Sequence, residues 1–250
     1  MIAFQILKAT MTKSKMLISV KIATRYLMIK SVQQIIDESL VRVPHEHSGK
    51  FKPSNFGRCY RLQIWARRDF PESNPPSPRE LRLFKCGNHF EDWVKSLILQ
   101  DGTGWVDGNT EEQVIECEDV KGFCDLIRSN EIADIKSQNS KAFWWKAKEI
   151  KMGKDIRDIV HHNWMQVMYY VREKQKQFGR LIFISKDDLC ISEYIQSWDD
   201  YWRGEIDMEL NVLRDYWADK ILPPAEPRAW KSECDYCQFA QACKQLEAAI

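Results

Sequence analysis

The sequence lacks any apolar run long enough to cross a bilayer, since no stretch approaches the roughly 20 residues that a spanning helix needs. We therefore expect no membrane association. An excess of one charge is missing too: the formal net charge is +1 at pH 7, so any nucleic-acid surface must be a local patch. Internal repeats and low-complexity segments are also absent from the sequence. These absences favour an ordinary globular protein.

The first 30 residues do not contain the uninterrupted apolar core of a signal peptide, because Lys or Arg breaks every apolar stretch. We therefore expect a cytoplasmic protein in a reducing compartment. Its eight cysteines are then better explained by metal ligation or core packing than by disulfides.

A chain of 250 residues suits one well-cored α/β domain with a small appendage. We expect residues 1–50 to form a leader and an amphipathic helix (about 23–40), and residues 51–250 to form the main domain. The patterns in that domain predict helices, a three-stranded meander, a helix, two strands, a helix and a cysteine-rich tail. The order favours a mixed central β-sheet flanked by helices. The expected ranges are a short helix around Cys59, a helix from Ser77 to about Leu99, strands at 111–119, 121–129 and 130–138, a helix at 161–178, strands at 181–186 and 189–194, and a helix at 198–220.

Two acids and a lysine are expected on one face of the sheet. Asp134 and Lys136 are two residues apart on a predicted strand, so their side chains share a face. A turn at Ser129-Asn130 makes Asp125, on the preceding strand, a neighbour of Asp134. Burial of such charges is explained by Mg2+ or Mn2+, which takes oxygen ligands and activates a water for attack on phosphorus. Lys136 would orient that water or stabilise the charge of the transition state.

An Asp-x-Lys pair alone is a weak motif, and the alternative is a solvent-facing pair on an edge strand. Four motifs in order add to it: GNHFE (87–91), GFCD (122–125), DIK (134–136) and QVMYY (166–170). Together they resemble the RecB-like branch of the PD-(D/E)xK nucleases. The resemblance implies a restriction-endonuclease-like core and metal-dependent DNA hydrolysis. It also implies Glu91 as a metal ligand, with His89 as the alternative, and Gln166 and Tyr170 as helix residues facing the active site.

Three cysteines near the C-terminal end, Cys234, Cys237 and Cys243, have the spacing C-x2-C-x5-C, which allows three thiolates to surround one metal centre. A second C-x-x-C pair, which zinc ribbons use, is missing, so the distant Cys59 is the candidate fourth ligand. A zinc site and a merely buried Cys59 remain alternatives.

This arrangement also resembles RecB-like nucleases with an iron–sulfur cluster, among them the CRISPR-associated "Cas four" exonucleases and AddB-type helicase-nucleases. These proteins carry one cysteine before the nuclease motifs and three after them. The resemblance spans about residues 52–243. It implies a [4Fe-4S] cluster held by the four cysteines and joining the two ends of the nuclease domain.

A basic and aromatic stretch between Asp134 and Gln166 is the candidate DNA contact, although a partly buried helix fits it nearly as well. Its candidate residues are Lys141, Trp144, Trp145, Lys146 and Lys148.

The resemblance implies an exonuclease acting on single-stranded DNA or overhangs. It would serve DNA processing, recombination, CRISPR spacer acquisition or a phage pathway, with other proteins of those pathways as partners. Two alternatives stay open: an iron–sulfur module that binds DNA ends and recruits a partner nuclease, and a redox-sensing cluster protein. Oligomeric state is not predicted.

Overall fold

The computed structural model describes residues 30–40 and 47–249. The chain divides into two units, Met1–Pro44 and His45–Ile250, and each is described by itself. In the first unit, helix α2 (Val32–Ser39) begins at a capping box formed by Ser31 and Gln34. The helix was expected from about residue 23, but residues 30 and 31 are not helical and α2 begins at Val32; residues 23–29 lie outside the described residues. Within the described ranges, no helix is both long and apolar enough to cross a membrane.

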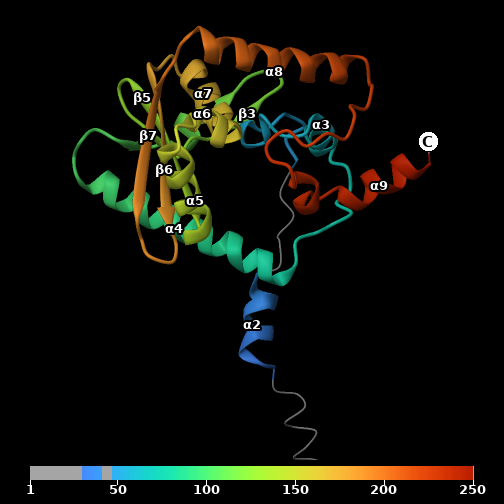
Figure 1. The fold of residues 1–250 in the computed structure, drawn as a ribbon, viewed down its shortest axis with the longest axis horizontal. Coiled ribbons are helices and arrows are strands. Elements are labelled where there is room, and N and C mark those ends of the chain that lie inside the picture. The colour runs from blue at the N-terminus through green and yellow to red at the C-terminus, as the bar shows by residue number, and fades with distance from the viewer. Residues whose placement is uncertain (1–29, 41–46, 250) are drawn as a thin grey trace, which may run out of the picture. The chain divides into compact units, whose positions relative to one another are not determined.

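A five-stranded mixed sheet forms the centre of the second unit (Figure 1). Strands β5 and β6 pair in parallel, and the other neighbours pair antiparallel. The predicted α/β class with a mixed sheet flanked by helices is therefore confirmed. In spatial order the strands are β1 (Val106–Asp107), β4 (Leu126–Ile127), β5 (Glu131–Gln138), β6 (Phe178–Ser185) and β7 (Ile191–Ser197).

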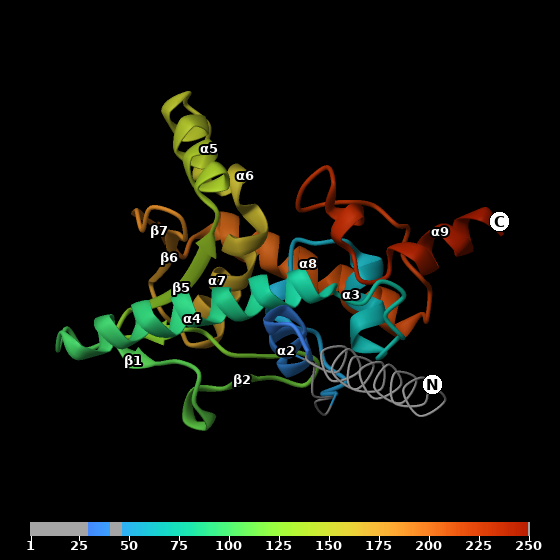
Figure 2. The ribbon, with the colours of Figure 1, turned by 90° about the horizontal axis from the view of Figure 1, so that it is seen from below.

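Helices cover both faces of this sheet (Figure 2). On one face lies α4 (Pro78–Gln100), whose Val94 packs with Ile135 and Ile182 of the sheet. Helix α7 (His161–Glu173) packs on the other face, and α8 (Asp200–Ala218) packs on α7. Helix α4 begins at Ser77, as predicted, because the Ser77 side chain and Glu80 form a capping box in front of Pro78.

The predicted three-stranded meander is wrong in its middle. The predicted middle strand divides: its first part, β3 (Lys121–Gly122), pairs with β2 (Ile115–Glu116) in a separate two-stranded sheet, and its second part, β4, joins β5 in the main sheet. The break falls at Asp125, whose Oδ2 accepts a hydrogen bond from the Ile135 backbone N–H at 2.6 Å. A side chain thus occupies the position that a strand carbonyl would have, and the ladder between β4 and β5 ends there.

Segments from both ends of the second unit pack together. A 3₁₀ helix, η1 (Pro53–Asn55), leads to the predicted short helix, α3 (Tyr60–Arg67), of which Cys59 is the N-cap residue. The tail forms η3 (Glu233–Tyr236) and α9 (Ala240–Ala248). Phe239 packs against Trp65 and Leu62 of α3, which brings the tail to the start of the unit.

The predicted basic and aromatic stretch folds as α5 (Ser140–Lys151), which begins directly after the end of β5. Figure 2 shows α5 beyond the tip of the β5 arrow, followed by the short helix α6 (Ile156–Ile159).

Candidate active site and cysteine cluster

Three carboxylates from three elements meet beside the sheet. Glu91 comes from α4, Asp125 from the residue preceding β4, and Asp134 from the middle of β5. The side chains of Glu91 and Asp125 share a hydrogen bond, Asp134 lies close enough to Glu91 to raise its pKa, and Asp125 lies close enough to Asp134 to raise the pKa of Asp134. The structure therefore brings together the three acids that the sequence singled out.

Lys136 completes this group. It lies two residues after Asp134 on β5, on the same face, and its Nζ is 2.8 Å from Asp134 Oδ2. Burial opposes the charged ammonium, but Asp134, Asp125 and then Glu91 outweigh it and raise the pKa of Lys136 above its usual value. The lysine is thus held protonated, while 30% of its side-chain surface stays exposed.

The pKa values of two of the acids are raised. Burial, followed by repulsion from Asp125 and a hydrogen bond with it, raises the pKa of Glu91 to about 8. Burial also raises the pKa of Asp134 to about 7, although Lys136 opposes the shift. At neutral pH, Glu91 and Asp134 therefore do not both ionise freely unless a further positive charge joins them.

The donor set fits a divalent cation. Among the described residues, no three His, Cys, Asp or Glu side chains already stand in a metal-holding arrangement. However, the buried Asp134 Oδ2 has no well-aligned hydrogen-bond donor in the described part of the chain, and Lys136 approaches it as an ion-pair partner. A buried anionic oxygen of this kind, next to two more carboxylates, is the environment that hard cations with oxygen ligands occupy.

Gln166 and Tyr170 lie one turn apart on α7, both buried, and their side chains share a hydrogen bond. Burial raises the pKa of Tyr170 well above its usual value, and Asp134 adds to the shift, so the phenol lies near the acids. Gly122 of β3 packs directly on this hydroxyl: a Cβ at Gly122 would lie 2.8 Å from Tyr170 Oη and 2.9 Å from Pro53 Cδ. His89, by contrast, is an exposed residue of α4.

The candidate DNA residues of α5 divide into two groups. Four of them, Lys141, Trp144, Trp145 and Lys148, are not buried. Lys146 is buried instead: its Nζ donates to Gln138 and lies 4.4 Å from the centroid of the Phe183 ring. Burial lowers the pKa of Lys146 to about 8. The prediction of a surface contact at Lys146 is not met, because α5 packs this side against the end of β6.

All four candidate cluster cysteines line one cavity of about 130 Å³: Cys59, Cys234, Cys237 and Cys243. Each is a free thiol, and Trp65 and Phe239 form part of the cavity wall. Burial, and to a smaller extent the neighbouring cysteines, raises the pKa of Cys237 to about 11.

Two donors point at these sulfurs. The Phe239 backbone N–H donates to Cys237 Sγ at 3.4 Å, and Arg61 Nη1 lies 3.7 Å from Cys243 Sγ. The four thiols therefore share one cavity with N–H donors at two of the sulfurs, but, as with the acids, no three of the described cysteines already stand in a metal-holding arrangement.

A buried network that no local sequence signal indicates supports this cavity. Glu233 is buried and accepts hydrogen bonds from Arg58 Nε at 3.1 Å, from the Cys59 backbone N–H at 3.2 Å and from the Arg228 backbone N–H at 2.9 Å. The Arg228 side chain in turn donates to the buried Glu209 of α8 at 2.8 Å. In the sequence Glu233 and Arg58 look like ordinary surface charges, because they lie 175 residues apart along the chain.

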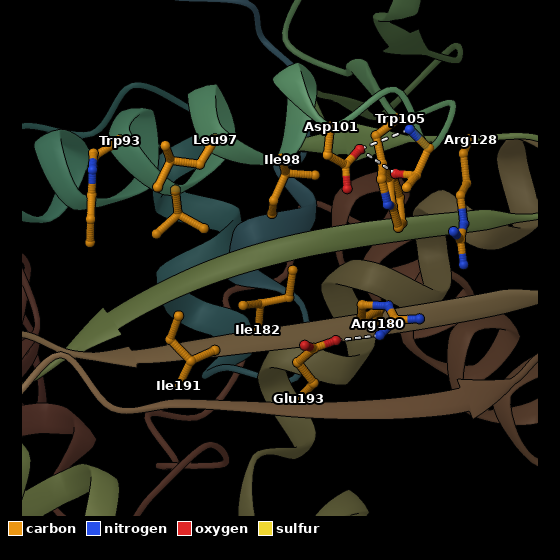
Figure 3. A pocket seen from close by; sticks show the side chains of 12 residues that line it. Trp93, Leu97, Ile98, Asp101, Trp105, Arg128, Arg180, Ile182, Ile191 and Glu193 are labelled. Carbon is orange, nitrogen blue, oxygen red and sulfur yellow. Dashed lines mark hydrogen bonds and ion pairs between the residues drawn. The ribbon is translucent and has the colours of Figure 1, made fainter.

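A pocket of about 390 Å³ between α4 and strands β6 and β7 is separate from these sites (Figure 3). Trp93, Leu97 and Ile191 line its apolar part. Its arginines are neutralised or covered: Arg180 pairs with Glu193, and Arg128 stacks on Trp105 with 4.5 Å between the guanidinium carbon and the ring centroid. None of the predicted site residues lines this pocket.

Comparison with known proteins shows which solved structures have a similar fold. No family model matches the chain, and no curated protein matches its sequence. The crystal structure of SSO0001 resembles it with a TM-score of 0.50 and 19% identity, over 83% of this chain and 91% of that one. An alkaline exonuclease from Laribacter hongkongensis (TM-score 0.44, 16% identity, 70% and 91% covered) and a phage-related exonuclease from Haemophilus somnus 129PT (0.40, 18%, 55% and 71%) superpose more loosely. At these identities the likeness concerns the fold, and function is argued from the site.

Proposed function

We propose that this chain is a divalent-metal-dependent nuclease that hydrolyses phosphodiester bonds in DNA. The observation that carries the proposal is the group of Glu91, Asp125 and Asp134 beside the protonated Lys136. Acids crowded together so that two of them have raised pKa values add little to stability, and such groups are characteristic of functional sites. We further propose that the protein acts as an exonuclease on single-stranded DNA or overhangs.

The three carboxylates would hold Mg2+ or Mn2+, which supplies Lewis-acid activation of a water and stabilises charge at phosphorus. Lys136 Nζ, kept protonated by the acids, would orient the attacking water and stabilise the negative charge on the phosphoryl oxygens. Gln166 and Tyr170 form the wall of the site on α7 and would position Lys136 or the substrate strand.

Cleavage of end-labelled single-stranded and duplex DNA tests the proposal. We expect wild-type protein to cut in Mn2+ or Mg2+ and Lys136→Ala to lose roughly 100-fold or more of the rate, as when one stabilising charge is removed. Lys220→Ala, at an exposed lysine that follows α8, is the matched control and should cut normally. Folded wild-type protein that binds DNA ends without cutting them would replace the nuclease by an end-binding module.

We further propose that the four cysteines hold a [4Fe-4S] cluster with a structural role. Their shared cavity at the meeting point of α3 and the tail supports this. Anaerobically purified protein should contain iron and sulfide, and Cys237→Ser should lose both, whereas Cys86→Ser, at an exposed cysteine of α4, should retain them. Zinc in place of iron would reject the cluster.

A further inference from the structure

A second pocket, of about 410 Å³, adjoins the candidate active site. We call it the Phe123 pocket. Gln166 and Tyr170 line it; Tyr170 also lies near Asp134 and Asp125, and Gln166 shares a hydrogen bond with Tyr170. Phe123 is two residues before Asp125, so their Cα atoms are at most about 7 Å apart. The pocket and the acids therefore share a wall. The remaining lining residues are Ser48, Lys52, Pro53, Ser54, Lys121 and Gly122.

The pocket combines positive charge with an aromatic surface. Lys52 forms no ion pair with a residue in the described ranges. Lys121 pairs with Glu116 at 2.9 Å, but Glu116 also accepts from Lys50 at 2.9 Å, so one carboxylate is shared by two lysines. A net positive charge therefore remains at the pocket. Phe123 lines it with 40% of its surface exposed, although the ring is large and apolar.

Exposed aromatic rings beside unneutralised lysines are the two elements that proteins use for unpaired nucleotides. The ring stacks on a base, and the ammonium groups attract the phosphate. A paired base is already stacked within its duplex and cannot offer its face to Phe123 without being extruded. The hydroxyls of Ser48 and Ser54 offer additional donors to phosphate or sugar.

We propose that the Phe123 pocket binds one unpaired nucleotide of the DNA strand, its base on Phe123 and its phosphate at Lys52 and Lys121. This inference rests on the proposed nuclease function for its choice of ligand, and it makes these residues determinants of specificity for unpaired strands. Gly122 has a place in this arrangement, because a Cβ there would lie 2.8 Å from Tyr170 Oη and 2.9 Å from Pro53 Cδ, and both residues line the pocket.

Binding measured without cleavage tests the pocket. A fluorescein-labelled single-stranded oligonucleotide and the blunt duplex of the same sequence are titrated in Ca2+, with fluorescence anisotropy as the readout. We expect Phe123→Ala to raise Kd for the single strand roughly tenfold and to leave duplex Kd within about twofold. Phe123→Trp should restore single-strand binding, because it replaces the stacking surface. Phe84→Ala, at a 53% exposed phenylalanine of α4, is the matched control and should bind as wild type does.

Lys52→Ala tests the phosphate half of the site. It should weaken single-strand binding and make log Kd less steep against log salt by about 0.7, the value for one phosphate that is no longer neutralised. Equal losses of affinity on both substrates, or Phe123→Ala binding the single strand as wild type does, would overturn the proposal. The two proposals can fail separately. If wild-type protein does not cut DNA in Mn2+, the proposed nuclease function is rejected. Whether the Phe123 pocket binds an unpaired nucleotide is tested by the binding measurements alone.

Discussion

At the scale of single residues, Glu91 is the most strongly perturbed acid of the site. Burial and Asp125 raise its pKa to about 8, so the folded state holds its proton more tightly than the unfolded state does. Stability from this group is therefore fully present below the ordinary value of 4.5 and is lost as pH rises toward 8. In the absence of a cation, the fold should weaken across that interval.

Glu91→Gln removes this titration. In EDTA at pH 8 we expect the variant to melt higher than wild type, by roughly 2–4 °C for each kcal/mol relieved, and the difference should vanish near pH 4.5. Addition of Mg2+ should raise the Tm of wild type at pH 8 but have little effect on the variant. Thermal melting checks both, with Glu247→Gln, at a 53% exposed carboxylate, as control. An unchanged pH dependence in Glu91→Gln would contradict the assignment.

At the scale of helices and strands, the sequence predicted the features whose signals lie close together in the chain. The capping box at Ser77 and Glu80 is such a signal, and so is the spacing that puts Asp134 and Lys136 on one face of β5. The division of the meander was not predictable, because it depends on a hydrogen bond from Ile135 to the Asp125 side chain, ten residues away. For α5 the sequence allowed both a DNA-facing stretch and a partly buried helix, but it could not tell that Lys146 is the lysine that is buried.

Strand β3 offers a test of the wall between the pocket and the acids. Gly122→Ala would place a Cβ 2.8 Å from Tyr170 Oη, so either the tyrosine or η1 must move. We expect at least a tenfold loss of DNA cleavage with the fold retained. Gly204→Ala in α8 is the matched control, because nothing lies within 4 Å of its added Cβ. That change should be neutral or stabilise by about 0.5–1 kcal/mol. Circular dichroism reports whether the fold is retained, and cleavage rates report the loss of activity. Full activity in Gly122→Ala would refute the close packing of Gly122 against Tyr170.

Helix α5 gives a further prediction. Lys141 and Lys148 are not buried, so Lys141→Glu/Lys148→Glu should weaken single-strand binding and its salt dependence, by about 0.7 in log–log slope for each phosphate left without a lysine partner. Lys146→Met should leave the salt dependence unchanged, because that ammonium is buried against Phe183. If the Lys141→Glu/Lys148→Glu variant binds DNA as wild type does, α5 does not contact the DNA.

At the scale of the whole second unit, Glu233 joins the tail to the start of α3. Glu233→Ala would leave Arg58 and the Cys59 and Arg228 backbone N–H groups without their buried acceptor. We expect a loss of about 3–5 kcal/mol in the free energy of unfolding, measured by urea denaturation, together with a lower iron content. Glu247→Ala removes an ion pair with Arg61 at a 53% exposed site and should change stability by less than about 1 kcal/mol. Similar small losses of stability in both variants would show that Glu233 does not hold the tail to the start of α3.

The same contact has a consequence for how the protein is made. Glu233 lies 174 positions after Cys59, and Arg61 lies 182 positions before Cys243. On the ribosome, the segment around Cys59 emerges long before its partners exist. The sheet with its acids and Lys136 is translated in between, before the three tail cysteines. Under the proposed cluster assignment, loading of the four cysteines would therefore be a late step of maturation, because Cys243 is made only after the whole sheet.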